Sequence, residues 1–400
     1  MPDESLIPIG SQERVSRRFA NRVSLFYGAI FGLLGTHLPF FPVWLRAVGI
    51  DAGWIGIIIA VPAVMRFTVL PFVTSIAERR HALRAVMILG AFTTLLGFCL
   101  VGSQHRAIPI FLAYVATCCL WTALAPLADA YALRGVVRYD LNYGRLRLWG
   151  SAAFIVGVLA CGLLVDVIAA SQLIWIIVAM AALATIAACG LQPIDTTKGR
   201  GALQHGDRAL LRQLGFLVII LAAALIQGSH SAYYAFASID WQNWGLGGVT
   251  IAGLWVLGVV AEIVVFALSP RFTLEPQALV IIGGLGAAAR WMITAEQPPL
   301  ALLAVVQLSH GLSFALTQIG TMGLLVRMVP DHVTARGQGY LAACSGIVSS
   351  CASILSGAIY AHYGQGVYYV MAVMAASGVI LIWCARNRLR SHPQSAASGG

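Results

Sequence analysis

The stretch Leu214–Ser238 reads LGFLVIILAAALIQGSHSAYYAFAS and contains no charged residue. An α-helix of about 20 predominantly apolar residues crosses the roughly 30 Å hydrocarbon core of a bilayer, so this stretch is long enough to span a membrane. Gln227, His230 and Tyr234 interrupt it at positions i, i+3 and i+7, which lie on one face of a helix. The stretch therefore predicts a membrane-spanning helix with one polar face.

The whole chain has the same character. Hydrophobic residues make up 59% of the 400 and charged residues 10%, and the mean hydropathy is +0.84. Soluble domains have roughly 45–50% apolar and about 25% charged residues. The composition predicts an all-α membrane protein. The net charge of +10 does not indicate nucleic-acid binding, because the basic residues lie in connections between apolar runs and not on one face of a soluble domain.

Apolar runs long enough to span a membrane recur twelve times, in two sets of six. The first set covers residues 23–47, 53–77, 83–102, 108–133, 146–167 and 170–191. The second set covers residues 214–238, 250–269, 278–295, 299–326, 336–361 and 366–385. We predict an N-terminal six-helix half at 1–192, a cytoplasmic linker at 193–213, a C-terminal six-helix half at 214–390 and a disordered tail at 391–400.

Most of the 25 basic residues fall on one side of the predicted membrane, which the positive-inside rule identifies as cytoplasmic. An even number of spans then places both termini on that side. We expect a multi-pass protein of the bacterial inner membrane that acts as a monomer, with the lipid bilayer as its surroundings.

Motifs for enzymatic or metal chemistry are absent from the sequence. The eight cysteines lie in or beside apolar runs without C-x-x-C spacing, and no phosphate-binding, H-E-x-x-H or G-x-S-x-G motif occurs. We expect neither a metal nor a cofactor, no catalytic residues, and a protein that is not an enzyme. A non-transporting sensor would have the same helices and stays open as an alternative.

Five charged residues fall within the predicted spans, namely Arg66, Asp129, Arg147, Glu262 and Arg290. At a helix centre each would cost about 2.5–3.5 kcal/mol on insertion scales, and such residues commonly mark function. Two pairs of opposite charge follow from the order of the helices, Asp129 with Arg147 and Glu262 with Arg290. Each pair could instead be a structural link between helices, and Arg66 could either extend towards the interface or line a pathway.

Histidines add to the polar character of the second half. His230 lies in the seventh predicted span and His310 in the tenth. A single membrane histidine is often only a hydrogen bond between helices. Two histidines together with Glu262 and Arg290 favour a site that responds to protons.

Five short motifs carry a resemblance to a known family: Gln227–Tyr234 (QGSHSAYY), Leu254–Glu262 (LWVLGVVAE), Tyr143–Arg145 (YGR), Leu148–Ser151 (LWGS) and Leu38–Phe40 (LPF). They resemble the major facilitator superfamily, and within it the phenylpropionate permease group, which is related to lactose permease. The resemblance extends over all twelve predicted spans and implies the major facilitator fold.

The resemblance also implies roles for individual residues. Asp129 and Arg147 resemble the acid and the arginine with which lactose permease binds sugar, whereas Glu262, Arg290 and His310 resemble its proton-coupling cluster. One departure concerns the position three residues after His310, where that permease has a proton-carrying glutamate and this chain has Ser313. Glu262 or Asp129 would therefore have to carry the proton.

The expected function is secondary active transport by alternating access, with the substrate bound near the membrane midplane between the halves. Our first expectation is a proton-coupled symporter of a small aromatic carboxylate such as a phenylpropionate-type acid. The alternative is a sugar or nucleoside proton symporter that uses carboxylates as hydroxyl acceptors. The expected substrate-binding residues are Asp129, Arg147, Gln227, His230, Tyr234, Trp255 and Arg66, and the expected proton-coupling residues are Glu262, Arg290, His310 and Asp129.

Overall fold

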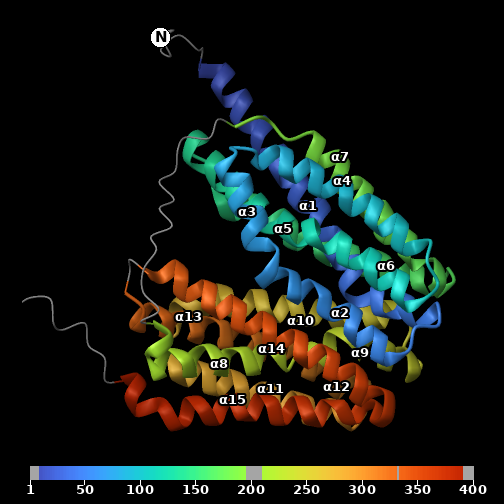
Figure 1. Cartoon of the computed structure of the whole chain (residues 1–400), viewed down its shortest axis with the longest axis vertical. Helices are drawn as coiled ribbons and strands as arrows, with labels where there is room; N and C mark the ends of the chain where they lie inside the picture. The colour runs from blue at the N-terminus through green and yellow to red at the C-terminus, as the bar shows by residue number, and fades with distance from the viewer. Residues whose placement is uncertain (1–8, 195–209, 331–332, 391–400) are drawn as a thin grey trace, which may run out of the picture. The chain divides into compact units, whose positions relative to one another are not determined.

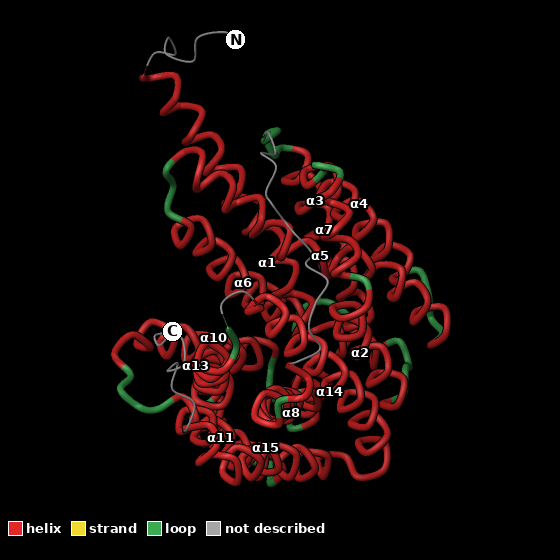
Figure 2. The backbone as a smooth tube through the Cα atoms, turned by 60° about the vertical axis from the view of Figure 1, so that its left-hand side comes forward, coloured by secondary structure: helices red, strands yellow, loops and turns green. Residues whose placement is uncertain are grey.

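The computed structural model describes residues 9–194, 210–330 and 333–390, and this part of the chain is helical with short connections and no strand (Figure 2). The predicted tail at 391–400 and most of the predicted linker at 193–213 lie outside the described residues. The prediction of an all-α protein is confirmed for the described chain.

The helices follow one another along the chain in the order of their labels and colours (Figure 1). The first seven α-helices are α1 Ile9–Ala47, α2 Ala52–Thr68, α3 Leu70–Arg79, α4 Leu83–Gly102, α5 Ala107–Tyr139, α6 Tyr143–Val165 and α7 Leu173–Cys189. The remaining α-helices are α8 Leu214–Gly228, α9 Ser231–Asn243, α10 Gly248–Leu268, α11 Pro276–Ala295, α12 Leu300–Leu308, α13 Thr317–Met328, α14 Thr334–Tyr363 and α15 Val367–Arg390. A π-helical turn, Gly311–Leu316, joins α12 to α13.

By length and apolarity, ten helices of the described chain could cross a membrane, or eleven if α2 and α3 are counted as one broken span. The 52-residue stretch Arg336–Asn387 counts once although it contains both α14 and α15. A 3₁₀ turn at Gly364–Gly366 separates these two helices, and Gly364 takes a left-handed conformation with φ of +51° that favours glycine. If α2 and α3 are counted as one span and α14 and α15 as two, the number becomes the twelve that the sequence predicts.

The second predicted span is broken at Val69, between α2 and α3. Pro71 explains the break, because proline has no backbone N–H and its ring clashes with the carbonyl group four residues earlier, which is that of Phe67. Proline is tolerated in the first turn of a helix, and Pro71 lies there in α3.

The helices form two compact units. The first contains α1, the helices from α3 to α7, and residues 247–252 at the start of α10. The second contains residues 51–67, which form α2, and the helices from α8 onward without those first residues of α10. The boundaries of the two halves along the chain, near 192 and 214, stay a prediction.

Glycines allow close helix contacts inside each unit. In the first unit a Cβ on Gly35 of α1 would lie 2.4 Å from the carbonyl oxygen of Phe154 in α6. In the second unit a Cβ on Gly56 of α2 would lie 2.8 Å from Cα of Gly357 in α14, and the Ser353 hydroxyl donates to the Gly56 carbonyl at 2.9 Å. Small residues let helix backbones approach closely in a membrane, where lipid offers no hydrophobic drive for association.

This packing predicts that Gly56→Ala destabilises the protein. The added methyl group would meet the backbone of α14, which cannot rotate away as a side chain can, and overpacking of this kind typically costs about 1–3 kcal/mol. The matched control is Gly253→Ala in α10, where an added Cβ meets nothing within 4 Å. Thermal unfolding of the two purified variants tests the contact, and equal melting temperatures would show that α2 and α14 do not pack in this way.

Candidate functional site

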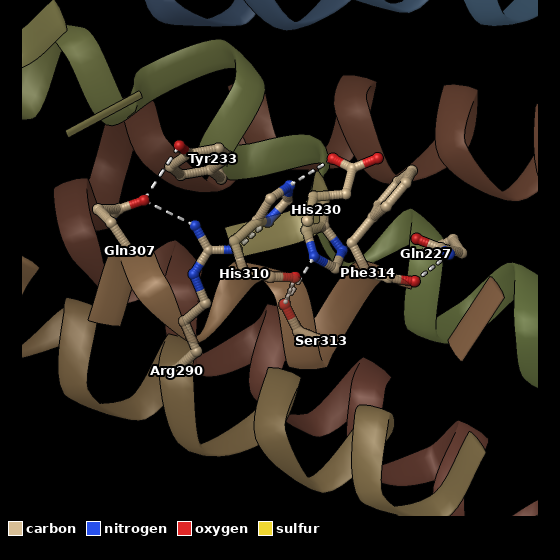
Figure 3. Close-up of polar contacts among 9 residues, drawn as sticks. Gln227, His230, Tyr233, Arg290, Gln307, His310, Ser313 and Phe314 are labelled. Atoms are coloured by element: carbon tan, nitrogen blue, oxygen red, sulfur yellow. Dashed lines mark hydrogen bonds and ion pairs between the residues drawn. The ribbon is translucent and has the colours of Figure 1, made fainter. Parts of the chain in front are cut away.

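A buried arginine is the centre of the polar site in the second unit (Figure 3). Arg290 of α11 is 1% exposed, and its Nη2 donates to Gln307 Oε1 at 2.9 Å while its Nη1 lies 2.7 Å from His310 Nδ1. The Tyr233 hydroxyl donates to the same Gln307 oxygen at 3.1 Å. The guanidinium carbon also lies 4.5 Å from the ring centres of Tyr233 and Trp291, at cation–π distance.

The contact with Arg290 determines the tautomer of His310. A guanidinium group only donates hydrogen bonds, so His310 Nδ1 must accept, and a neutral imidazole then carries its hydrogen on Nε2. That Nε2 atom lies 3.8 Å from Glu262 Oε2. Arg290, His310 and Glu262 therefore form a chain. The imidazole in its middle accepts from the guanidinium on one side and faces the carboxylate with its N–H on the other.

The direct pairing of Glu262 with Arg290 that the sequence suggested is wrong in detail. His310 lies between the two groups, and no ion pair joins them among the described residues. The reason is steric, because the imidazole of His310 fills the space next to the guanidinium. The carboxylate of Glu262 is partly exposed, with 27% of its side chain accessible.

The break in the seventh span explains the position of His230. The Ser229 hydroxyl donates to the Ile226 carbonyl at 2.6 Å, and His230 Nδ1 lies 3.2 Å from the same oxygen. The backbone N–H of His230 bonds to Gln227 O instead, at 3.2 Å. Side chains that take a helix carbonyl compete with the i to i−4 ladder, so α8 ends at Gly228 and α9 begins at Ser231.

Ser313 links the two histidines. His230 is fully buried and its Nε2 lies 3.3 Å from Ser313 Oγ, which in turn lies 3.2 Å from the backbone oxygen of His310. The hydroxyl has one hydrogen, which can point either at the imidazole or at the carbonyl. Ser313 can thus relay a hydrogen bond but holds no charge.

A π-helical turn places these side chains. Gly311–Leu316 begins directly after His310, and turns of this kind are frequent at functional sites. A Cβ on Gly311 would lie 2.6 Å from the carbonyl oxygen of Ala261, so the glycine lets the turn approach α10 next to Glu262. The carbonyl of Phe314 in the turn accepts a hydrogen bond from Gln227 Nε2 at 3.3 Å.

The remaining predicted residues of the second unit differ in their surroundings. Trp255 is buried, donates to Ser238 Oγ at 2.9 Å and has its ring centre 4.6 Å from that of Tyr233. Tyr234 stacks on Trp255 at 6.2 Å and keeps partial exposure. Arg66 is exposed near the end of α2 and does not belong to the hydrogen-bonded network around Arg290.

The first unit holds a second polar cluster, around Asp129 of α5. Its Oδ1 atom accepts hydrogen bonds from Tyr27 at 2.6 Å and Tyr143 at 2.9 Å, and lies 3.9 Å from Arg147 Nε. The Arg147 guanidinium lies 3.8 Å from the centre of the Phe31 ring. The structure thus brings Asp129 and Arg147 together as the short connection between their helices predicts.

Sequence reasoning missed several members of these clusters. Tyr27 is far from Asp129 in the chain, so only the packing of α1 against α5 reveals it.

Asp240 of α9 is 1% exposed and accepts hydrogen bonds from Tyr360 and from Tyr368, the latter at 3.0 Å. The predicted span ended two residues before Asp240, whereas α9 continues to Asn243. A longer estimate of that span would have identified Asp240 as a further intramembrane acid.

Comparisons with known proteins agree with this architecture. The MFS_1 like family matches residues 21–371. The "Probable 3-phenylpropionic acid transporter" of Escherichia coli (strain K12) is 28% identical over 368 residues, which are 90% of this chain and 96% of that protein. The "Maltose permease" of Geobacillus stearothermophilus is also 28% identical, over 92% of this chain and 94% of that protein.

The crystal structure of the nucleoside transporter NupG has a TM-score of 0.79 and covers 94% of this chain and 100% of its own, at 15% identity. At that identity the likeness shows the fold alone. This likeness confirms the predicted major facilitator fold. The family match, over residues 21–371, covers most of the chain. The chain therefore belongs to the MFS_1 like family and is a multi-pass secondary transporter of the major facilitator superfamily, not an enzyme.

Proposed function

We propose that the chain is a proton-coupled symporter of a small organic anion, with an aromatic carboxylate as substrate. The observation that carries the proposal is the chain Arg290–His310–Glu262, in which a buried cation and a partly exposed acid act on one neutral imidazole. We further propose that both termini lie in the cytoplasm and that the membrane is the bacterial inner membrane, which the distribution of basic residues along the sequence supports.

The coupling follows from charge. With Glu262 ionised, its negative charge offsets that of Arg290 across the imidazole of His310. At about twice the 4 Å separation of a direct ion pair, such an interaction is worth about 2 kcal/mol at an effective dielectric constant of 20. Protonation of Glu262 removes that offset and leaves the guanidinium charge available to an anion. Protonation of Glu262 therefore raises the affinity for an anion by about 30-fold, and anion binding raises the proton affinity of Glu262 by the same factor. Symport requires this reciprocity.

The aromatic preference rests on the rings around Arg290. Tyr233 and Trp291 lie against the guanidinium, and Tyr234 stacks on Trp255 while remaining partly exposed. Tyr234 also lies 5.5 Å from Tyr233, ring centre to ring centre, so a half-buried ring and a buried cation belong to one aromatic cluster. Such a cluster suits a ligand that has an aromatic ring and a carboxylate. The relative from Escherichia coli, whose name specifies 3-phenylpropionic acid, supports the same chemical class.

A sugar or nucleoside is the second candidate substrate, and the cluster in the first unit favours it. Asp129, with Tyr27 and Tyr143 around its carboxylate, offers acceptor and donor atoms suited to hydroxyl groups. The relative named maltose permease and the fold likeness to a nucleoside transporter are consistent with this class.

Uptake into proteoliposomes with an imposed pH gradient tests the proposal. We expect gradient-dependent accumulation of aromatic carboxylates, and no accumulation of maltose or uridine, because only an anion exploits the charge released at Arg290. Dissipating the gradient with a protonophore is the control. Accumulation of a sugar or nucleoside alone would favour the second candidate, and no gradient-dependent uptake of any compound would remove the symport proposal.

Glu262→Gln tests the role of the carboxylate. The amide keeps the shape of the side chain but cannot bind or release a proton, so we expect loss of uphill uptake with exchange of labelled for unlabelled substrate preserved. Glu296→Gln is the matched control, because Glu296 is an exposed acid at the end of α11 whose side chain accepts from Tyr369. If the Glu262→Gln protein still accumulated substrate against a gradient, a residue other than Glu262 would have to carry the proton.

A further inference from the structure

A cationic cavity lies in the first unit, where α4 begins and α5 ends, and it shares no lining residue with the polar clusters described above. α4 and α5 run side by side there (Figure 1). The cavity has a volume of about 280 Å³, close to the lower end of the roughly 300–1,000 Å³ of ligand pockets. Its walls come from residues 81–85 and 88, from Tyr131 and Arg134 of α5, and from Pro193 and Ile194 after α7.

Two arginines in this cavity have buried N–H groups that lack a partner within the described chain. Arg84 Nε and Arg134 Nη1 are both inaccessible to solvent and have no hydrogen-bond acceptor there. Among the described residues no acidic side chain forms an ion pair with either arginine. Buried donors are almost always satisfied in native proteins, and an unpaired donor on a charged group is especially unfavourable.

The first turn of α4 also lines this cavity. α4 begins at Leu83, and its N-cap residue, Ala82, has no side-chain oxygen to accept from the first turn. The first N–H groups of a helix have no partner within the helix, and they carry the positive end of its dipole. His81 precedes them in a left-handed conformation with φ of +50°, which turns the chain from α3 into α4. Helix amides and arginines together form the usual donor set for a phosphate group.

We infer that this cavity binds a phosphate-type anion, supplied either by the headgroup of an anionic phospholipid or by free phosphate. Two guanidinium groups and the uncapped amides of α4 supply the donors that such a group accepts. Its location at a helix end, on the side where most basic residues fall, puts it at the level of lipid headgroups. Apolar wall residues such as Leu83 and Ile88 suit the glycerol and upper acyl part of a lipid.

The site is independent of the transport proposal, so a binding experiment on the intact protein tests it alone. Full-length protein in a neutral detergent is titrated with phosphatidylglycerol or phosphatidylcholine in mixed micelles, and separately with inorganic phosphate or chloride at matched ionic strength. Thermal unfolding reports binding. We expect phosphatidylglycerol to raise the melting temperature more than phosphatidylcholine does. A shift with inorganic phosphate but not with chloride would identify free phosphate as a ligand.

Substitutions locate the effect. Arg84→Gln and Arg134→Gln should each raise the concentration of phosphatidylglycerol needed for a given shift by about fivefold, as expected for the loss of one basic group near an anionic surface. Arg80→Gln is the matched control, because Arg80 is an exposed arginine in the same connection and does not line the cavity. Ala85→Phe would place a large side chain in the cavity while keeping both arginines, so it also should abolish the response. This variant tests the site if an arginine variant fails to fold.

Two outcomes would overturn the inference. The first is a wild-type melting temperature that neither phosphatidylglycerol nor inorganic phosphate raises above its control. The second is a response that persists unchanged in Ala85→Phe and in the arginine variants, which would show general attraction to a basic surface.

Discussion

A guanidinium group in a membrane protein must find hydrogen-bond acceptors, and the second unit is arranged around that requirement at Arg290. Gln307 of α12 and His310, which follows that helix, supply the acceptors, and the rings of Tyr233 and Trp291 cover the guanidinium. Because arginine cannot accept, His310 must present its bare nitrogen to Arg290 and its N–H towards Glu262. One buried cation thus fixes the orientation of the histidine and, through it, the surroundings of the acid.

Irregular backbone makes this arrangement possible. The seventh span breaks at Ser229 and His230, where two side chains take the carbonyl of Ile226, and the tenth span widens into a π-helical turn directly after His310. In a regular helix the carbonyl of Phe314 would accept from its own hydrogen-bond ladder, whereas here it accepts a hydrogen bond from Gln227. The membrane tolerates such breaks only where the freed groups are satisfied by protein, as they are here.

The sequence predicted the helical class, the apolar runs and the closeness of Asp129 to Arg147, because each of these depends on composition or on residues joined by one short connection. It did not predict the imidazole between Glu262 and Arg290, since that depends on how the backbone after α12 packs against α10 and α11. The contact of Tyr27 with Asp129 was also missed, because α1 and α5 are far apart in the chain. The unpaired donors of Arg84 and Arg134 were missed because a sequence does not show which acceptors surround a side chain. The predicted end of the seventh span, set by apolarity alone, concealed Asp240. The fold does not fix the substrate, since relatives named for an aromatic acid and for maltose are both 28% identical to this chain.

The central claim is that an anion at Arg290 draws a proton onto Glu262. It is tested most directly by mixing purified protein with the transported acid in a weakly buffered solution near neutral pH and recording the change in pH. The account predicts proton uptake by the wild-type protein and none by Glu262→Gln. Binding without proton uptake in the wild type, or equal uptake in the variant, would contradict it.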